Sequence, residues 1–392
     1  MSFNSRNSDT SRVATFESFS HPSVDQGASS SGSRKATSKQ RILHLLFSSR
    51  IAGSERYCID LANGQAALGH EVHVAGTFGS PMAALLSKEV IFHGFATPFL
   101  RGMRLRRLIA SAAIEIAHAH LSPACKALAA APASVTKIAT LHVGFKAKQH
   151  ARLDGVICVN RAQLSRLGNY AGQARLISNW LPAVEEDESF DLRSKLKLPR
   201  ETTLVGAVGR LHPSKGYDVL VSAFRRAAPD DAALVIVGEG PQRAALKNLS
   251  KGDNRIHLLR HSDNVSGFLR NLDLFVSPSR EESFGLAILE AMHEGLPIIA
   301  TAAEGPSEYL RDHPVTLVEP GSIDRLAAAL GDAFYVKAAV GLSRVVYDLR
   351  PFSRTAGIAN VLDFYSQVAE RTAAAGISAD LSEMYQAQPE EG

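Results

Sequence analysis

Two glutamates, Glu282 and Glu290, stand eight residues apart in the stretch Glu282-Ser-Phe-Gly285-Leu-Ala-Ile-Leu-Glu290. Eight helical residues span about 12 Å, on the order of the distance from a ribose to a hexose across a diphosphate. Carboxylates accept hydrogen bonds from hydroxyl groups, and free N–H groups at a helix start suit a phosphate. Gly285 lets the backbone approach a ligand closely. A surface carboxylate on a buried helix is the alternative, but Glu290 has apolar neighbours that an unpaired charge avoids. The spacing therefore indicates a sugar-nucleotide site.

The elements around this pair read as strand, loop, helix and strand. An apolar run over residues 272–276 ends at a Ser/Pro cluster. A helical pattern opens near Phe284 and closes at Gly295-Leu-Pro297, and a second apolar run follows. Short apolar runs bounded by turn residues are typical of buried parallel strands.

A second loop carries two cations. The apolar run over residues 203–208 ends in Gly209-Arg210, and Lys215-Gly216 follows before a helical pattern begins. Arg210 and Lys215 are five residues apart on a loop bounded by glycines, so they can hold a diphosphate from two sides. Surface basic residues are the alternative, but their place at the end of a strand favours the site.

Histidines mark the ends of two expected strands in the first half of the chain. The run over 114–117 leads to His118-Ala-His120, and the run over 137–141 ends at His142. Open α/β sheets bind ligands at these ends, which makes His120 and His142 candidate site residues beside the alternative of a structural role. Alternate strand residues point the same way, so His118 and His120 could chelate a metal, but no third ligand stands near them in the sequence.

These blocks resemble the family 4 retaining glycosyltransferases, the "glycosyl transferases group 1". The resemblance covers about residues 41–370 and is strongest over 204–320. Its motifs are Glu282-x7-Glu290, Gly209-Arg210-x4-Lys215-Gly216, His118-x-His120, Thr140-x-His142, and Ala52-Gly53-x-Glu55-Arg56 where the family usually has Gly-Gly-x-Glu-Arg.

The resemblance implies an α/β protein of GT-B fold, with two doubly wound Rossmann-like domains facing across a cleft. It implies transfer of a sugar from a nucleotide diphosphate sugar to a hydroxyl acceptor, with retention at the anomeric carbon. The implied catalytic residues are Glu282, His120 and His142. The implied donor-binding residues are Gly53, Arg210, Lys215, Ser283, Phe284, Gly285, Leu286 and Glu290, with Glu282 on the transferred sugar and Glu290 on the ribose. Arg260 and His261 form the implied base-binding loop. Arg260 stands where the family commonly has glycine, so the resemblance does not identify the base of the nucleotide.

The predicted organisation has five parts. Residues 1–40, rich in Ser and charge, are expected to be a disordered tail. An acceptor-side domain over 41–182 precedes a nucleotide-sugar-binding domain over 200–350. The resemblance implies that a helix over 352–370 returns to the first domain, and residues 373–392 are expected to be a tail.

Charge and composition limit the partners. The 392 residues carry a net charge of +4, but residues 41–180 hold 16 Lys and Arg against 6 Asp and Glu. No nucleic-acid reader motif accompanies these basic residues. Their excess favours an anionic membrane face or a lipid-linked glycan acceptor. In a helix predicted near residues 98–109, Arg101, Arg104 and Arg107 flank an apolar face, which fits either a solvated helix or one resting on anionic lipid.

The three cysteines are scattered, which argues against disulfides or a zinc site and for a reducing compartment. We therefore expect a cytoplasmic protein. If its basic residues bind anionic lipid, we expect it at the inner face of the membrane. The chain lacks Asp-x-Asp, the motif of metal-dependent transferases of the other main fold, and we expect no essential metal or other cofactor.

Other functions remain open. A phosphorylase or a sugar-nucleotide epimerase would keep the fold, and a phosphorylase would consume inorganic phosphate. A non-catalytic sugar-nucleotide sensor would bind a donor without releasing nucleoside diphosphate. An NAD oxidoreductase rests on Gly238-x-Gly240 alone, and Arg243 occupies the sixth position, where that fingerprint requires Gly or Ala.

Overall fold

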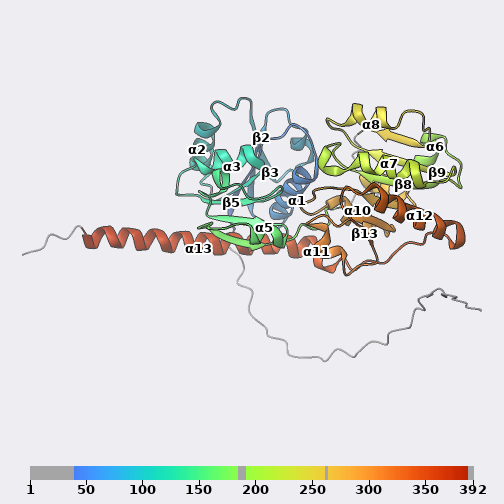
Figure 1. Ribbon diagram of the computed structural model, residues 1–392. Coiled ribbons are helices and arrows are strands. Elements are labelled where there is room, and N and C mark those ends of the chain that lie inside the picture. Colours follow the sequence, from blue (N-terminus) through green and yellow to red (C-terminus); the bar gives the residue numbers. More distant parts are fainter. Residues whose placement is uncertain (1–38, 184–190, 261–263, 387–392) are drawn as a thin grey trace, which may run out of the picture. The chain divides into compact units, whose positions relative to one another are not determined.

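The computed structural model describes residues 39–183, 191–260 and 264–386, all within one compact unit of the chain (Figure 1). Two parallel sheets organise them. The first has the strand order β3-β2-β1-β4-β5-β6-β7 and the second the order β10-β9-β8-β11-β12-β13. In each sheet the first three strands add in one direction and the fourth pairs with the other side of the first, as in doubly wound Rossmann-like folds. The predicted pair of Rossmann-like α/β sheets is therefore confirmed.

The strands and helices have the following bounds. The first sheet contains β1 (Arg41–Leu46), β2 (Glu71–Thr77), β3 (Val90–Phe95), β4 (Ile116–His120), β5 (Thr136–Thr140), β6 (Gly155–Cys158) and β7 (Gln173–Leu176). Its helices are α1 (Gly53–Ala67), η1 (Pro81–Leu85), α2 (Arg101–Ser111), α3 (Leu121–Ala129), α4 (Ala147–His150) and α5 (Arg161–Ser165). The second sheet contains β8 (Thr203–Val208), β9 (Ala232–Val237), β10 (Ile256–Leu259), β11 (Leu274–Ser277), β12 (Ile298–Thr301) and β13 (Thr316–Val318). The helices of this part are α6 (Leu192–Leu196), η2 (Pro213–Lys215), α7 (Tyr217–Ala227), α8 (Arg243–Leu249), α9 (Val265–Arg270), α10 (Leu286–His293), α11 (Pro306–Leu310), α12 (Ile323–Val340), η3 (Arg350–Phe352) and α13 (Arg354–Gln386).

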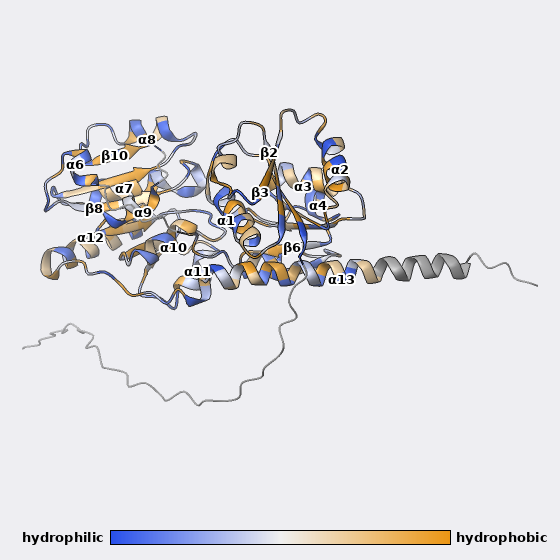
Figure 2. Ribbon diagram, turned by 180° about the vertical axis from the view of Figure 1, so that it is seen from behind, coloured by the Kyte–Doolittle hydropathy of each residue, from blue (hydrophilic) through white to orange (hydrophobic). Residues whose placement is uncertain are grey.

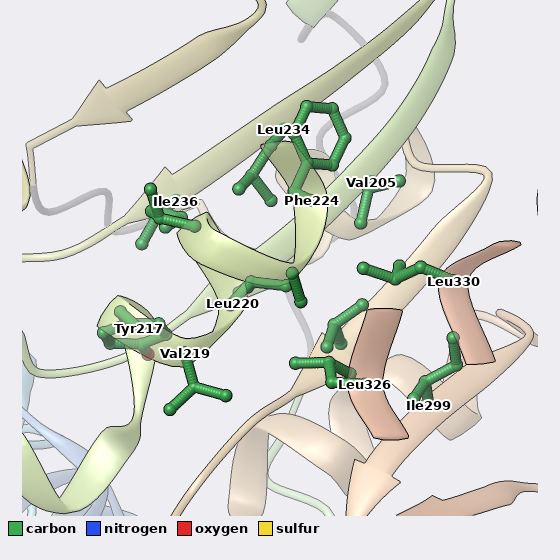
Figure 3. Close-up of a cluster of buried hydrophobic side chains, with 14 of the residues drawn as sticks. Val205, Tyr217, Val219, Leu220, Phe224, Leu234, Ile236, Ile299, Leu326 and Leu330 are labelled. Carbon is green, nitrogen blue, oxygen red and sulfur yellow. The ribbon is translucent and has the colours of Figure 1, made fainter. Parts of the chain in front are cut away.

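Most strand residues are apolar because helices cover both faces of each sheet. Every residue of β9 is buried, and the strands of the second sheet are mostly orange in Figure 2. On one face of the second sheet, Leu220 and Phe224 of α7 pack with Leu330 of α12 over the strands (Figure 3). On the other face, α10 buries Ile288 and Leu289. The helix that carries Glu290 is thus fixed by the core.

The long helix α13 packs against the first sheet. Its buried side chains Ile358, Val361 and Tyr365 join one core cluster with residues of β1, β4, β5 and β6. The helix extends to Gln386 and so includes residues 373–386 of the predicted tail. Alanine-rich sequence after Thr372 has high helix propensity, which the prediction underweighted. None of the helices in the described ranges combines the length and apolar character that spanning a membrane requires.

Two further predictions meet the structure here. His118 and His120 lie inside β4 rather than after it, because the strand runs three residues beyond the apolar run that predicted it. The predicted disordered tail over residues 1–40 falls, except for its last two residues, outside the described residues.

Candidate functional site

The predicted site residues gather where strand order reverses. In the second sheet the reversal lies between β8 and β11, and the loops after these strands carry Lys215 and Glu282. In the first sheet it lies between β1 and β4, which are followed by Gly53 and end at His120. Open parallel sheets bind ligands at such switch points, outside the carboxyl ends of the strands.

Lys215 and Glu282 form an ion pair through the Lys215 ammonium and Oε2 of Glu282. The side chains are 25% and 15% exposed, so the pair is partly shielded from water. The sequence assigned these residues separately to the diphosphate and to the sugar, and the structure brings them together. An ammonium has three donors, which leaves Lys215 able to contact a phosphate while it holds the carboxylate.

The backbone fixes the two loops against each other. The carbonyl oxygen of Ser214 accepts hydrogen bonds from the amides of Arg280 at 2.7 Å and Glu281 at 3.1 Å. The Arg280 guanidinium also binds both carboxylate oxygens of Asp218, at 2.8 and 2.6 Å. These bonds hold the residues on either side of Lys215 and Glu282, so the pair is positioned by its neighbours.

Glycines occupy two tight backbone positions near the pair. Gly216 has φ +64°, and a Cβ there would lie 2.0 Å from the carbonyl oxygen of Pro278. Gly285 has φ +91° and caps α10, and a Cβ there would lie 2.9 Å from Ile288. Since side chains rarely adopt such positive φ angles, only glycine fits both positions without strain.

The segment before α10 also contacts the first half of the chain. The Asn160 side-chain amide donates to the carbonyl oxygen of Ser283 at 2.7 Å, and the Tyr309 hydroxyl donates to that of Phe284 at 3.0 Å. Gly53, at the start of α1, lies against Leu286: a Cβ on Gly53 would be 3.5 Å from Leu286 Cδ1. The structure thus brings Gly53 beside Leu286 and adds Asn160, which holds Ser283.

Glu290 is paired with Arg56 across the same region, with 3.0 Å between Nη1 and Oε1. Burial raises the pKa of the Glu290 carboxyl, and the Arg56 guanidinium opposes that shift. Arg56 belongs to the Gly53-x-Glu55-Arg56 block, where only Gly53 was assigned a role. The apolar neighbours of Glu290 in the sequence could have indicated that a cation from another part of the fold pairs with it.

Within the described residues, no hydrogen bond or ion pair links the remaining donor-side predictions Arg210 and Arg260 to this group. The Arg210 side chain is exposed, and within the described ranges it makes no hydrogen bond or ion pair. Arg260 is also exposed and lies 4.0 Å from Glu239. His261 lies outside the described residues.

Gly238 and Gly240 have a packing role. A Cβ on Gly238 would lie 1.9 Å from the carbonyl oxygen of Gly209, and one on Gly240 would lie 2.3 Å from that of Leu211. The Arg243 guanidinium donates to the carbonyl oxygens of Gly238 and Leu259, both at 3.1 Å. Close backbone packing therefore accounts for the Gly-x-Gly sequence, and no dinucleotide site is needed to explain it.

Histidine rings of the first sheet form a hydrogen-bonded row. His142 Nε2 lies 3.1 Å from His120 Nδ1, and His120 Nε2 lies 3.1 Å from His44 Nδ1. His44 Nε2 lies 2.7 Å from Oε1 of Gln65. The sequence prediction missed His44 and Gln65, although His44 lies on β1, directly beside β4. His118 lies outside the row and contacts Tyr365 at 2.5 Å and Thr140 at 2.8 Å.

Burial sets the protonation of these rings. It lowers the pKa of His44 and His142 to about 4 and that of His120 well below its usual value. Cys58 approaches His44 and His120, with ligand atoms within 4.8 Å of one another. This is the third ligand that the sequence did not reveal. The facing imidazole nitrogens lie at hydrogen-bond distance, however, and burial raises the pKa of the Cys58 thiol, so neutral hydrogen-bonded groups account for the cluster.

Two family models match the chain, and solved structures share its fold. Residues 51–184 match the model described as "Glycosyltransferase Family 4", and residues 202–334 match "Glycosyl transferases group 1". The lipopolysaccharide core biosynthesis glycosyltransferase LpsE of Rhizobium meliloti (strain 1021) is 28% identical over 174 residues, which make up 43% of this chain and 47% of the relative. The match thus spans less than half of that relative's length.

A glycosyltransferase from Rickettsia africae ESF-5 aligns with a TM-score of 0.68 and 18% identity, over 84% of this chain and 99% of that one. Anabaena Alr3699/HepE in complex with UDP-glucose aligns with a TM-score of 0.67 and 19% identity, over 86% and 99%. At such identities the likeness shows the fold, and the GT-B prediction is confirmed.

Proposed function

Because the chain belongs to the glycosyltransferases of family 4 and group 1, we propose that it transfers a hexose from a nucleotide diphosphate sugar to a hydroxyl acceptor, with retention. The observation that carries this proposal is the Lys215–Glu282 pair, fixed beside the start of α10 with Glu290 further along that helix. The name of the Rhizobium relative supports lipopolysaccharide or a related cell-surface glycan as the product class.

Each side chain has a task in this proposal. Lys215, Arg210 and the amide groups at the start of α10 stabilise the leaving diphosphate. Glu282, held by Lys215, accepts hydrogen bonds from the transferred sugar, and Glu290 accepts them from the ribose. His120 and His142 contribute from the first sheet, and Arg260 and His261 lie in the loop that meets the base. The cations supply the positive charge that a metal provides elsewhere, so we expect activity without added metal.

Retention follows if both bonds change on one face of the sugar. The bond from the anomeric carbon to the diphosphate oxygen breaks, and a bond to the acceptor oxygen forms on the same side. The acceptor proton moves to the departing phosphate oxygen. Because Glu282 is neutralised by Lys215, it is better suited to bind hydroxyls than to attack the anomeric carbon.

A lipid-linked acceptor at the inner face of a membrane fits the first sheet. Helix α2 buries Leu105 and Ile109 and leaves Arg104 and Arg107 exposed. Phe99, just before α2, is 95% exposed. An apolar ring beside arginines suits an anionic lipid surface.

The test is nucleoside diphosphate release by the purified chain from a panel of UDP- and GDP-sugars, with candidate glycan acceptors and with or without EDTA. We expect release from at least one donor, unaffected by EDTA, and a loss of about 10²–10³-fold in Glu282→Ala, as for removal of a group that stabilises a transition state. The neighbouring exposed Glu281 supplies the control, since Glu281→Ala should keep wild-type turnover.

Other outcomes would replace the proposal. Donor binding without release under every condition would indicate a sensor. Consumption of inorganic phosphate would indicate a phosphorylase, and formation of an isomeric sugar nucleotide would indicate an epimerase.

A further inference from the structure

Four side chains form a continuous hydrogen-bonded row from α1 to the end of β5. Gln65, His44 and His120 are fully buried, and His142 at the end of the row is partly exposed. The three successive contacts are 2.7, 3.1 and 3.1 Å long. The ring of Tyr57 meets the His142 ring edge-on, at 5.2 Å between centroids and 75° between planes, and so restrains its orientation.

All the hydrogen bonds of the row point the same way, because each neutral imidazole donates from one N–H and accepts at one bare nitrogen. Burial lowers the pKa of all three histidines, so the rings are neutral near pH 7. The carbonyl oxygen of Gln65 can only accept, so Nε2 of His44 donates to it. Nδ1 of His44 must then accept from Nε2 of His120, and Nδ1 of His120 must accept from Nε2 of His142.

The proton on His142 is therefore placed at Nε2, and Nδ1 is left with its lone pair. Within the ranges that the structure describes, Nδ1 of His142 has no hydrogen-bond partner. The ring follows β5 at the sheet edge that also carries Gly53 and Arg56. A bare imidazole nitrogen at that edge accepts from a hydroxyl group and repels another acceptor.

We propose that Gln65 and His44 are positioning residues that hold His142 as the Nε2–H tautomer, so that its Nδ1 accepts a hydrogen bond from a hydroxyl of the donor sugar. The inference rests on the proposed function for its ligand, whereas the tautomer is a property of the protein alone. An amide of Gln65 turned the other way would donate to His44 and reverse all three protons. The orientation of one buried amide thus decides whether His142 accepts or donates.

The direct test is the ¹⁵N NMR spectrum of the full chain labelled at histidine, because ¹⁵N shifts distinguish protonated from bare ring nitrogens. The His142 signals are assigned by their loss in His142→Gln. We expect a protonated Nε2 and a bare Nδ1 in the wild type. Gln65→Leu should give a mixture of tautomers at His142, and Gln65→Glu, which keeps an oxygen facing His44, should restore one tautomer.

Thr140→Val is the matched control, because Thr140 bonds His118 in the same buried cluster but lies outside the row. It should leave the His142 spectrum unchanged, and circular dichroism checks that each variant is folded. A protonated Nδ1 in wild-type His142, or an unchanged tautomer in folded Gln65→Leu, would overturn the inference.

Kinetics connect the tautomer to the site. With the nucleotide sugar that gives the fastest release in the panel, Gln65→Leu should raise the donor KM about tenfold, the usual scale for one hydrogen bond. Gln65→Glu should restore the KM, and Thr140→Val should not change it. An unchanged KM in a Gln65→Leu variant with mixed tautomers would remove the substrate role of His142. If the wild type turns over no donor, the proposed function fails, and the NMR measurement still decides the tautomer.

Discussion

The Arg56 guanidinium lies 3.0 Å from Oε1 of Glu290, although the two residues are 234 positions apart in the sequence. Arg56 comes from α1, which follows the first strand of one sheet, and Glu290 comes from α10 of the other. The carboxylate that we assign to the ribose is therefore paired with a cation from the opposite half of the chain. Its pKa is raised by burial, and Arg56 limits that rise.

Arg56→Ala should weaken donor binding and make it more sensitive to acid. The carboxylate form of Glu290 accepts the ribose hydroxyls, so kcat/KM for the donor falls as the pH drops through the pKa of Glu290. Removing the cation raises that pKa further, so the fall should begin at a higher pH than in the wild type. The kcat/KM profile between pH 8 and 5 measures this shift. Arg50→Ala, at an exposed position of the loop that precedes α1, should keep the wild-type profile, and an identical profile for Arg56→Ala would contradict the assignment.

Lys215 and Glu282 should act as one unit. Lys215→Met should lower turnover about 10²–10³-fold, because it removes a cation from the diphosphate and leaves Glu282 unpaired. The double variant Lys215→Met/Glu282→Ala should lose far less than the product of the single losses, since residues in contact are not additive. Turnover of the four proteins measures the coupling. Lys247→Met, exposed on α8, serves as the control. Fully multiplicative losses would show that the pair has no joint role.

The basic face of α2 should govern binding to anionic lipid. Arg104→Glu/Arg107→Glu reverses two exposed charges on a helix whose buried face is formed by Leu105 and Ile109. Sedimentation with phosphatidylcholine vesicles, with and without phosphatidylglycerol, measures the effect. We expect wild-type binding only to the anionic vesicles and a loss of about tenfold or more, since each basic residue near such a surface contributes ~1 kcal/mol. Arg311→Glu, exposed in the second half, should bind as the wild type does. Equal binding by the α2 variant would dismiss the membrane proposal.

Asp60 connects two distant segments and should matter for stability. Its carboxylate accepts from Arg354 Nε at 2.8 Å and from Trp180 Nε1 at 2.7 Å. Asp60→Ala leaves a buried indole N–H unpaired and leaves the Arg354 guanidinium with only its bond to the carbonyl oxygen of residue 60, so the free energy of unfolding should fall by about 2–4 kcal/mol. Urea denaturation measures this loss. Asp363→Ala removes an equally short pair with Arg175, but that carboxylate is 61% exposed, and the loss should stay below about 1 kcal/mol. Equal losses would show that burial does not decide the effect.

Sequence reasoning reached those features that depend on local pattern. The apolar runs located the strands of both sheets, and the bounds of β8 agree with the prediction to the residue. Glycine and charge spacing identified the loops of Lys215 and Glu282, because both lie within one strand-loop-helix unit. The Ala-rich continuation of α13 to Gln386 was missed because frayed ends and propensity-driven helices look alike in sequence.

Features that depend on tertiary packing could not be predicted. Arg56 meets Glu290, and Asn160 meets Ser283, only because two separate sheets are brought together. His44 lies in an apolar run and carries no motif, so its place in the histidine row follows only from the pairing of β1 with β4.

The buried histidines should make the fold sensitive to acid. Burial lowers the pKa of His44 from 6.5 to about 4, so its proton binds more tightly to the unfolded chain. The stabilisation is then complete above pH 6.5 and is lost as the pH falls from 6.5 towards 4. For His44 alone the free energy of unfolding should fall on the order of 2 kcal/mol between pH 7 and 5. His118 and His120, whose pKa values are also lowered, should add to the slope. Urea denaturation at pH 7, 6 and 5 measures it, and His44→Asn should reduce the slope. His293→Gln, exposed on α10, should not. A wild-type stability that is flat over this range would mean that these rings bind protons equally well in the folded and the unfolded protein, and would contradict their lowered pKa values.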